Sequence, residues 1–116
     1  MSNTTATPRL ALNSHTRTAA TRIRNLATRH SGSARAAWIK ECEAGCVTDR
    51  TRAAHIRWER MAERATALRH WMNRDGEEAA AALSLCLDIA LMYRGCGDRS
   101  WNYVIRSVEA LAEYLA

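Results

Sequence analysis

The 116-residue chain contains a single proline, Pro8, so the strongest helix-breaking residue is absent from position 9 onward. Only five glycines interrupt the rest, phenylalanine is absent, and runs of β-branched residues are scarce. Alanine and arginine, which both favour helices, are abundant. The sequence therefore predicts an all-α fold. At this length we expect one domain, with a core large enough to need neither metal nor disulfides.

Apolar residues recur at spacings of three and four along most of the chain, and glycine or polar residues separate these segments. The first predicted helix runs from Asn13 or Ser14 to His30, and Gly32 is placed to end it. The further predicted helices are a short one over Ala34–Ala44 and longer ones over Asp49–Asn73, Glu77–Arg94 and Arg99–Leu115. Short loops between them favour a small antiparallel helical bundle of four main helices plus one short helix.

The predicted core follows the apolar stripes of these helices. Trp58 and Trp101 both lie on such stripes, so we expect both in the core. The segment Ala79–Met92 is apolar on nearly every side and is predicted to be the central buried helix. Asp88 within it is then the acid expected to be buried, paired with an arginine from a neighbouring helix. The same segment is too short and too polar to span a bilayer, which takes about 20 apolar residues.

The N-terminal residues 1–12 are polar and lack the apolar centre of a signal peptide. We therefore expect a flexible tail followed by a single bundle domain over residues 13–116. With no membrane segment, the chain is predicted to be cytoplasmic, where its four cysteines stay reduced. The four histidines are expected on the surface.

The cysteines show only a weak metal-binding pattern. Cys42 and Cys46 lie four residues apart, without the two-residue spacing of a zinc knuckle. We predict that Cys42 and Cys86 pack in the core as small apolar groups, and that Cys46 and Cys96 are exposed. No metal and no cofactor is expected.

The net charge of +5 is divided unevenly along the chain. Residues 1–75 carry 14 basic and 6 acidic side chains, which gives +8, whereas residues 76–116 carry 3 and 6, which gives −3. The bundle domain thus has a basic part over 13–75 and an apolar, acidic part over 76–116. Such asymmetry indicates a basic surface for polyanions and a second region for core or partner contacts.

Arginines recur at spacings that place them on shared helix faces. The long third segment carries three arginines seven residues apart, and the first segment carries two such pairs with no acid before Glu41. Guanidinium groups along a rigid helix suit a phosphate backbone, because each neutralised phosphate releases counterions. Trp71 lies next to the apolar stripe of the Asp49–Asn73 helix, not on it, and is the tryptophan expected at an interface. The predicted nucleic-acid or partner-binding residues are Arg17, Arg22, Arg24, Arg29, Arg50, Arg57, Arg60, Arg64 and Trp71.

The sequence has no phosphate-binding glycine loop, no nucleophile motif and no obvious pair of acids directed at one cleft, so no catalytic residue and no enzyme activity is predicted. The favoured function is a binding or regulatory protein that docks an arginine-rich helical face on nucleic acid or a nucleoprotein complex. The alternative is a protein-directed inhibitor or adaptor, such as a phage or mobile-element anti-defence (anti-CRISPR-like) protein, because arginine and tryptophan dominate protein interfaces.

Two simpler interpretations stay open. In the first, the arginines are solvated faces, and Glu59 and Glu63 pair with them locally. In the second, the chain forms a homodimer through spare apolar surface of the C-terminal helix, from Val104 to Leu115. A homodimer is compatible with either binding function.

Overall fold

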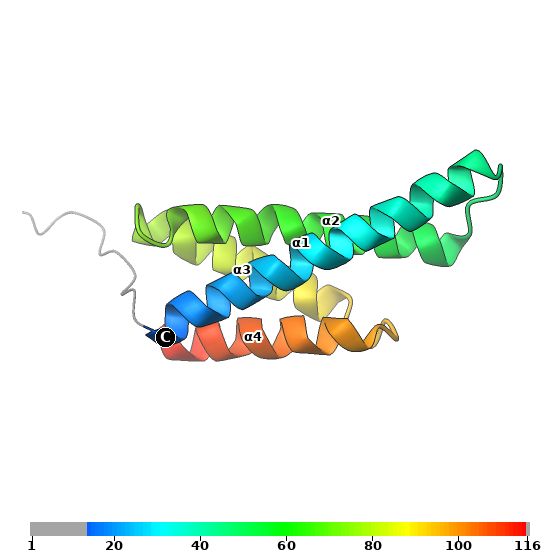
Figure 1. Ribbon diagram of the computed structural model, residues 1–116. Helices are drawn as coiled ribbons and strands as arrows, with labels where there is room; N and C mark the ends of the chain where they lie inside the picture. Colours follow the sequence, from blue (N-terminus) through cyan, green and yellow to red (C-terminus); the bar gives the residue numbers. More distant parts are fainter. Residues whose placement is uncertain (1–13, 116) are drawn as a thin grey trace, which may run out of the picture.

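The computed structural model describes residues 14–115, which form four α-helices and the loops that join them (Figure 1). The helices are α1 (Ser14–Glu43), α2 (Asp49–Trp71), α3 (Gly76–Met92) and α4 (Arg99–Leu115). No strand occurs in this range, so the predicted all-α fold is confirmed. The tail predicted over residues 1–12 lies outside the described residues.

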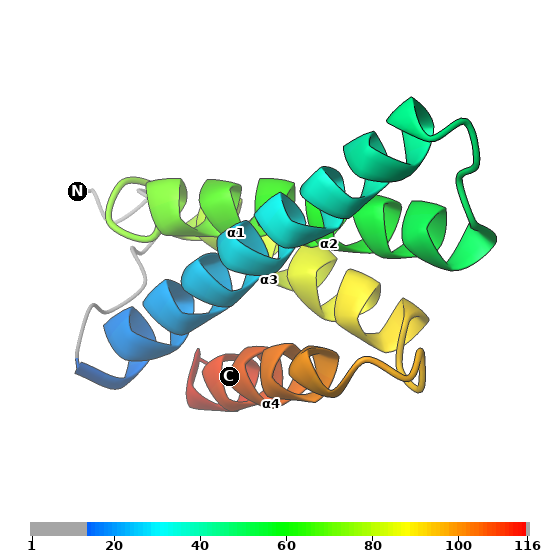
Figure 2. The ribbon, with the colours of Figure 1, turned by 45° about the vertical axis from the view of Figure 1, so that its right-hand side comes forward.

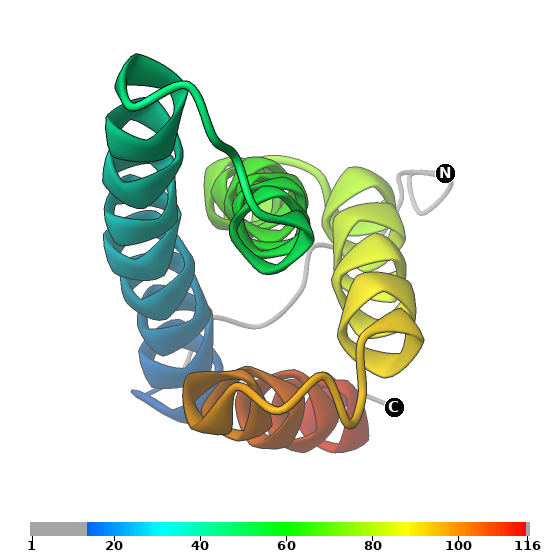
Figure 3. The ribbon, with the colours of Figure 1, turned by 90° about the vertical axis from the view of Figure 1, so that its right-hand side faces the viewer.

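The four helices form a ring in which successive helices run antiparallel. α1 packs on α2 and α4 from one side, and α3 packs on the same two helices from the other side (Figure 3). Within the described range, α1 and α3 share no close backbone contact. The molecule measures 63 × 22 × 22 Å, because the end of α1 and the start of α2 project beyond the ring as a two-helix arm (Figure 2).

Large side chains from α2 and α4 fill the centre of the ring. Trp58 and Trp101 are 2% and 1% exposed, which confirms their predicted place in the core. Their rings meet edge to face with centroids 4.7 Å apart. The Trp101 indole N–H donates a hydrogen bond of 3.0 Å to the Ala90 carbonyl and so ties α4 to α3. Other fully buried side chains include Ile23, Met61, Leu68, Val104, Val108 and Leu111.

The predicted break at Gly32 does not occur, and the short second helix is simply the second half of α1. Gly32 does not adopt the left-handed backbone conformation that ends a helix. Two stacked ring pairs hold both halves of α1 on α2: His30 on Trp58 at 4.6 Å, and Trp38 on His55 at 4.9 Å. These contacts outweigh the roughly 1 kcal/mol that an interior glycine costs a helix. Both histidines are half-buried, contrary to the surface position expected for them.

The prediction that Ala79–Met92 is the central buried helix is wrong. One face of α3 packs inward, but Leu85, Leu91 and Met92 are 39%, 44% and 64% exposed on its outer face. Asp88 is also exposed, so the prediction that it is buried is wrong as well. Much of the apolar signal of this segment comes from alanine, and an alanine side chain gains little from burial. No described helix is both long and apolar enough to cross a membrane.

α4 places its apolar face inside the ring as predicted. Val104, Ile105, Val108 and Leu111 are all at most 7% exposed within a single chain. These four side chains of the face are therefore used by the core of a single chain. Large exposed apolar side chains elsewhere include Leu85, Leu91 and Met92 on α3.

Side chains cap the starts of three helices, which satisfies backbone N–H groups that lack a helical acceptor. Thr48 Oγ1 accepts from the Thr51 amide at 3.2 Å at the start of α2. Asp75 Oδ1 accepts from two amides of the first turn of α3, at 3.0 and 3.1 Å. Asp98 Oδ1 accepts from the Ser100 amide at 2.9 Å at the start of α4. These caps explain why all three helices begin within one residue of their predicted starts.

Candidate nucleic-acid interface

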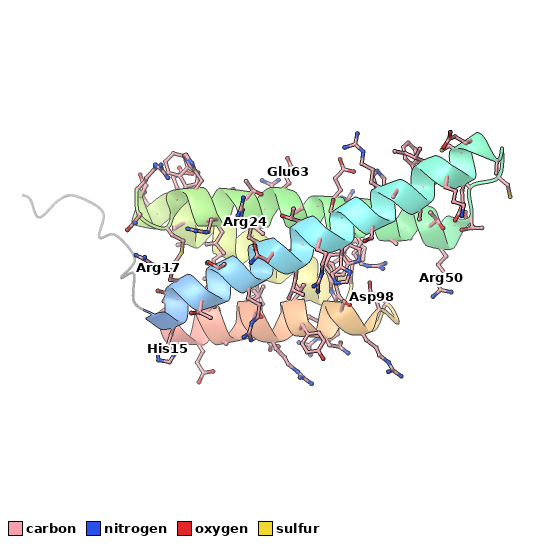
Figure 4. The ribbon with its side chains drawn as sticks, in the orientation of Figure 1. His15, Arg17, Arg24, Arg50, Glu63 and Asp98 are labelled. Carbon is pink, nitrogen blue, oxygen red and sulfur yellow. The ribbon has the colours of Figure 1, made fainter. Side chains whose placement is uncertain are left out.

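Four of the predicted binding residues lie in the N-terminal half of α1 and are exposed: Arg17, Arg22, Arg24 and Arg29. We call these four residues the α1 arginine face. Residues seven apart on a helix nearly superimpose, so they form two rows along the outer surface. Arg17 and Arg24 follow the edge toward α2, and Arg22 borders α4 (Figure 4). None of the four forms an ion pair with a described carboxylate.

A shallow hollow of about 520 Å³ runs along the α1 arginine face. It is lined by Arg17, Thr18, Thr21, Arg22, Asn25, Leu26 and Arg29. The hydroxyl and amide groups among these residues are the neutral donors that commonly contact phosphate and sugar oxygens. No described acid lines this hollow, so an anion meets only attractive charge there.

A second hollow of about 590 Å³, which we call the α1–α4 groove, continues from the first because Arg22 and Thr18 line both. On the α4 side it is lined by Tyr103, Arg106, Ser107 and Ala110. Tyr103 is 57% exposed, and the Arg106 guanidinium lies 6.0 Å from the centre of its ring. An exposed aromatic ring between arginines is the combination on which bases stack while phosphates are neutralised.

The four predicted arginines of α2 do not extend this surface. Arg50 and Arg57 lie beside the α3–α4 loop, and Arg60 donates a 2.9 Å hydrogen bond to the Tyr93 hydroxyl. Arg64 is exposed and lies near the α3 thiol of Cys86; burial raises the pKa of that thiol, and the Arg64 charge acts in the opposite direction. All four therefore face α3 and α4, whereas α1 packs on the opposite side of α2. The predicted basic surface is divided between two sides of the molecule.

The side chain of Arg57 is buried and contacts core residues. Its side chain is 10% exposed and its Nη2 lies 3.7 Å from Asp98 Oδ2, while its guanidinium sits 5.7 Å from the centre of the Trp101 ring. The same Asp98 oxygen accepts a 2.9 Å hydrogen bond from the Trp58 indole N–H. Asp98 therefore joins α2 to the start of α4. Sequence reasoning missed this contact, because nothing in the sequence links residues 58 and 98.

His30 lies at the inner edge of the α1 arginine face but adds no charge to it at neutral pH. Burial lowers the pKa of His30 below its usual 6.5, and the neighbouring Arg29 lowers it further. Asp98 opposes this shift but does not overcome it. His30 is therefore a neutral ring stacked on Trp58, and the charge of the α1 arginine face comes from arginine.

Trp71 is half-buried, packs against the core and meets the His70 ring edge to face at 4.7 Å.

Cys42 is exposed on the arm, so its predicted core position is wrong, whereas Cys86 is buried and Cys46 and Cys96 are exposed as predicted. Burial raises the pKa of the Cys86 thiol to about 12. Within the described range, no three His, Cys, Asp or Glu side chains gather as metal ligands.

Comparison of the chain with protein-family models, with curated protein sequences and with solved structures found no match. The α1 arginine face and the α1–α4 groove are therefore interpreted from their own residues. Sequence reasoning missed Tyr103 and Arg106, since only the order of the helices in the ring brings them beside Arg22.

Proposed function

We propose that the protein is a non-enzymatic nucleic-acid-binding protein that docks through the α1 arginine face and the α1–α4 groove. The observation that carries the proposal is the continuity of these two hollows, lined by exposed arginines without a described ion-pair partner. Charges without local partners gain most from a phosphate backbone, because nothing in the protein has to be displaced. Both rows lie on the one helix α1, which fixes their spacing.

The α1–α4 groove favours a single strand over a duplex. The exposed Tyr103 ring offers a stacking surface, and Arg22 and Arg106 flank it in the same groove. Unpaired bases can reach such a ring, whereas paired bases are stacked within their own helix. Phosphates of the same strand then follow the rows of the α1 arginine face.

Fluorescence anisotropy with labelled single-stranded and duplex DNA and RNA tests this proposal. The double variant Arg22→Gln/Arg29→Gln should bind every nucleic acid about tenfold more weakly, because two phosphate contacts are lost. Tyr103→Ala should weaken single-strand binding by about tenfold, since one stacked base is worth roughly 1–3 kcal/mol. The same substitution should leave duplex binding nearly unchanged.

The matched control is Arg52→Gln/Arg94→Gln, which removes the same formal charge. Both arginines are more than half exposed but already face acids, Asp49 at 4.0 Å and Glu109 at 3.6 Å. The control should keep the wild-type affinity within about twofold. Equal weakening by control and test variants would show that net charge, and not the α1 arginine face, governs binding.

A second candidate is a protein-directed inhibitor or adaptor, and the outer face of α3 favours it. Leu85, Leu91 and Met92 are exposed there, on the side of the ring opposite α1 (Figure 3). Exposed apolar side chains gathered on one face mark protein-docking sites. A partner captured from nuclease-treated lysate should then be lost with Leu85→Ser/Met92→Ser and kept with Arg22→Gln/Arg29→Gln. The reverse result would return that partner to the arginine surface.

A further inference from the structure

A separate groove of about 660 Å³ opens between the first turns of α2 and the α3–α4 loop. We call it the α2–α4 groove. It is lined by Arg50, Ala53, Ala54, Arg57, Cys96, Gly97, Asp98 and Arg99. The two alanines leave space on the α2 side, where longer side chains would fill it. The volume falls within the range of small-molecule sites, about 300–1,000 Å³.

The groove lies beside the first turns of two helices. α2 and α4 run in the same direction, and α2 begins in the arm, beyond the start of α4 (Figure 1). The N-terminus of a helix carries a partial positive charge, which disfavours cations in the first turn. Arg50 lies in the first turn of α2 next to Asp49, and Arg99 lies in the first turn of α4 directly after the capping Asp98. The partial positive charge of the helix starts and the two guanidinium groups favour an anion that enters the groove.

Arg57 provides the second, independent observation. Its side chain is nine-tenths buried and lines the groove, and its Nε–H has no hydrogen-bond acceptor among the described residues. Asp98 is the only acid that lines the groove among the described residues. Its two oxygens already accept from the Trp58 indole and the Ser100 amide, and it faces Arg57. Three guanidinium groups therefore stand against one carboxylate that is already engaged.

We propose that the α2–α4 groove binds a phosphate monoester dianion, held between Arg50 and Arg99 with Arg57 behind them. The planar guanidinium fork matches two phosphate oxygens at once, and the charge-assisted bonds are strong. Arg50 extends from α2 on the side where Asp98 of the α3–α4 loop lies (Figure 4). The site is independent of the proposed function, because its residues lie on α2, the α3–α4 loop and α4, and not on the outer surface of α1.

Two-dimensional ¹H–¹⁵N NMR of the full chain titrated with inorganic phosphate and pyrophosphate tests the site. We expect shifts of the Gly97 and Ser100 amides and of the Arg57 side-chain Nε–H. Arg50→Gln/Arg99→Gln should weaken pyrophosphate binding by at least about tenfold, since two charge-assisted contacts are lost. Both side chains are exposed, so this variant should keep the wild-type spectrum outside the groove.

The control variant is Arg52→Gln/Arg74→Gln, which removes two exposed arginines outside the groove and should keep the wild-type affinity. A 5′-phosphorylated oligonucleotide compared with its 5′-hydroxyl form separates the two sources of the ligand. A preference for the 5′-phosphorylated form that Arg50→Gln/Arg99→Gln abolishes identifies a nucleic-acid end. Equal binding of both forms, with phosphate and pyrophosphate still bound, identifies a small phosphorylated molecule. Absence of shifts, sulfate binding as tight as pyrophosphate binding, or equal weakening by the control would overturn the proposal.

Discussion

Asp98 is the side chain whose removal should most clearly test how the ring is held together. One carboxylate accepts from the Trp58 indole at 2.9 Å and from the Ser100 amide at 2.9 Å, and lies 3.7 Å from Arg57. It therefore connects α2 to the N-terminus of α4 beside Trp58. Replacement by alanine removes all three interactions at once.

The expected loss follows from these contacts. Leaving the indole N–H of the buried Trp58 without an acceptor costs about 1–3 kcal/mol, and losing a helix cap costs about 1 kcal/mol. A fully buried ion pair broken on one side would cost about 3–5 kcal/mol, but Asp98 is 28% exposed, so solvent screening reduces that share. The three contributions belong to one side chain and do not simply add. We expect Asp98→Ala to lower the free energy of unfolding by about 3–4 kcal/mol.

Urea unfolding followed by tryptophan fluorescence measures this loss. Asp98→Asn keeps an oxygen for the Ser100 amide but loses the charge and one acceptor, so it should cost about 2 kcal/mol. In an Arg57→Met background the same substitution should cost about 1 kcal/mol less, because no unpaired guanidinium remains. Asp88→Asn, an exposed acid on α3, is the control and should stay within about 0.5 kcal/mol of the wild type. A loss for Asp98→Asn no larger than that of the control would refute this account of the ring.

Three further predictions concern the backbone, a histidine and the thiols. Gly32→Ala should raise the free energy of unfolding by about 0.5–1 kcal/mol, because the new methyl group meets nothing within 4 Å in a continuous helix. A destabilising effect of Gly32→Ala would contradict the continuity of α1. Gly97→Ala should lower the free energy of unfolding by about 1–2 kcal/mol, since φ is 90° at Gly97. Burial, and then the Arg29 charge, lower the pKa of His30 below 6.5, so its protonation should destabilise the fold. The contribution of neutral His30 to the free energy of unfolding is fully present above pH 6.5 and declines as the pH falls below that value. His30→Phe should flatten that decline in urea unfolding measured against pH, and an unchanged profile would argue against it. A thiol reagent at neutral pH should react quickly with the exposed Cys42, Cys46 and Cys96 and slowly with Cys86, whose pKa is about 12; mass spectrometry would expose any early labelling of Cys86.

Local signals in the sequence account for most helix boundaries. Thr48, Asp75 and Asp98 are polar side chains placed to cap, and the helices begin where these caps require. Gly32 is the exception, since helix propensity is a local preference that stacking of His30 and Trp38 on α2 overrides.

Charge and burial were harder to predict, because both depend on which helices meet. The sequence singles out Asp88 as the acid that pairs with an arginine of a neighbouring helix. In the structure Asp98 forms such a pair, from a loop that only the fold brings beside Trp58 and Arg57. The seven-residue spacing of Arg57 with its neighbours predicts a surface band, but that edge of α2 turns toward α3 and α4. The arginines of α1 stay exposed because no helix covers the outer side of α1 in the ring.

The central claim is that the exposed arginines of α1, with Arg106, contact a phosphate backbone, and the salt dependence of binding tests it most directly. Single-strand affinity measured across salt concentrations should give a log–log slope of about −3, as expected for four or five neutralised phosphates. Arg22→Gln/Arg29→Gln should make that slope shallower by about 1.4, whereas Arg52→Gln/Arg94→Gln should leave it unchanged. Absence of binding at low salt, or a slope that the α1 variant does not alter, would contradict the claim.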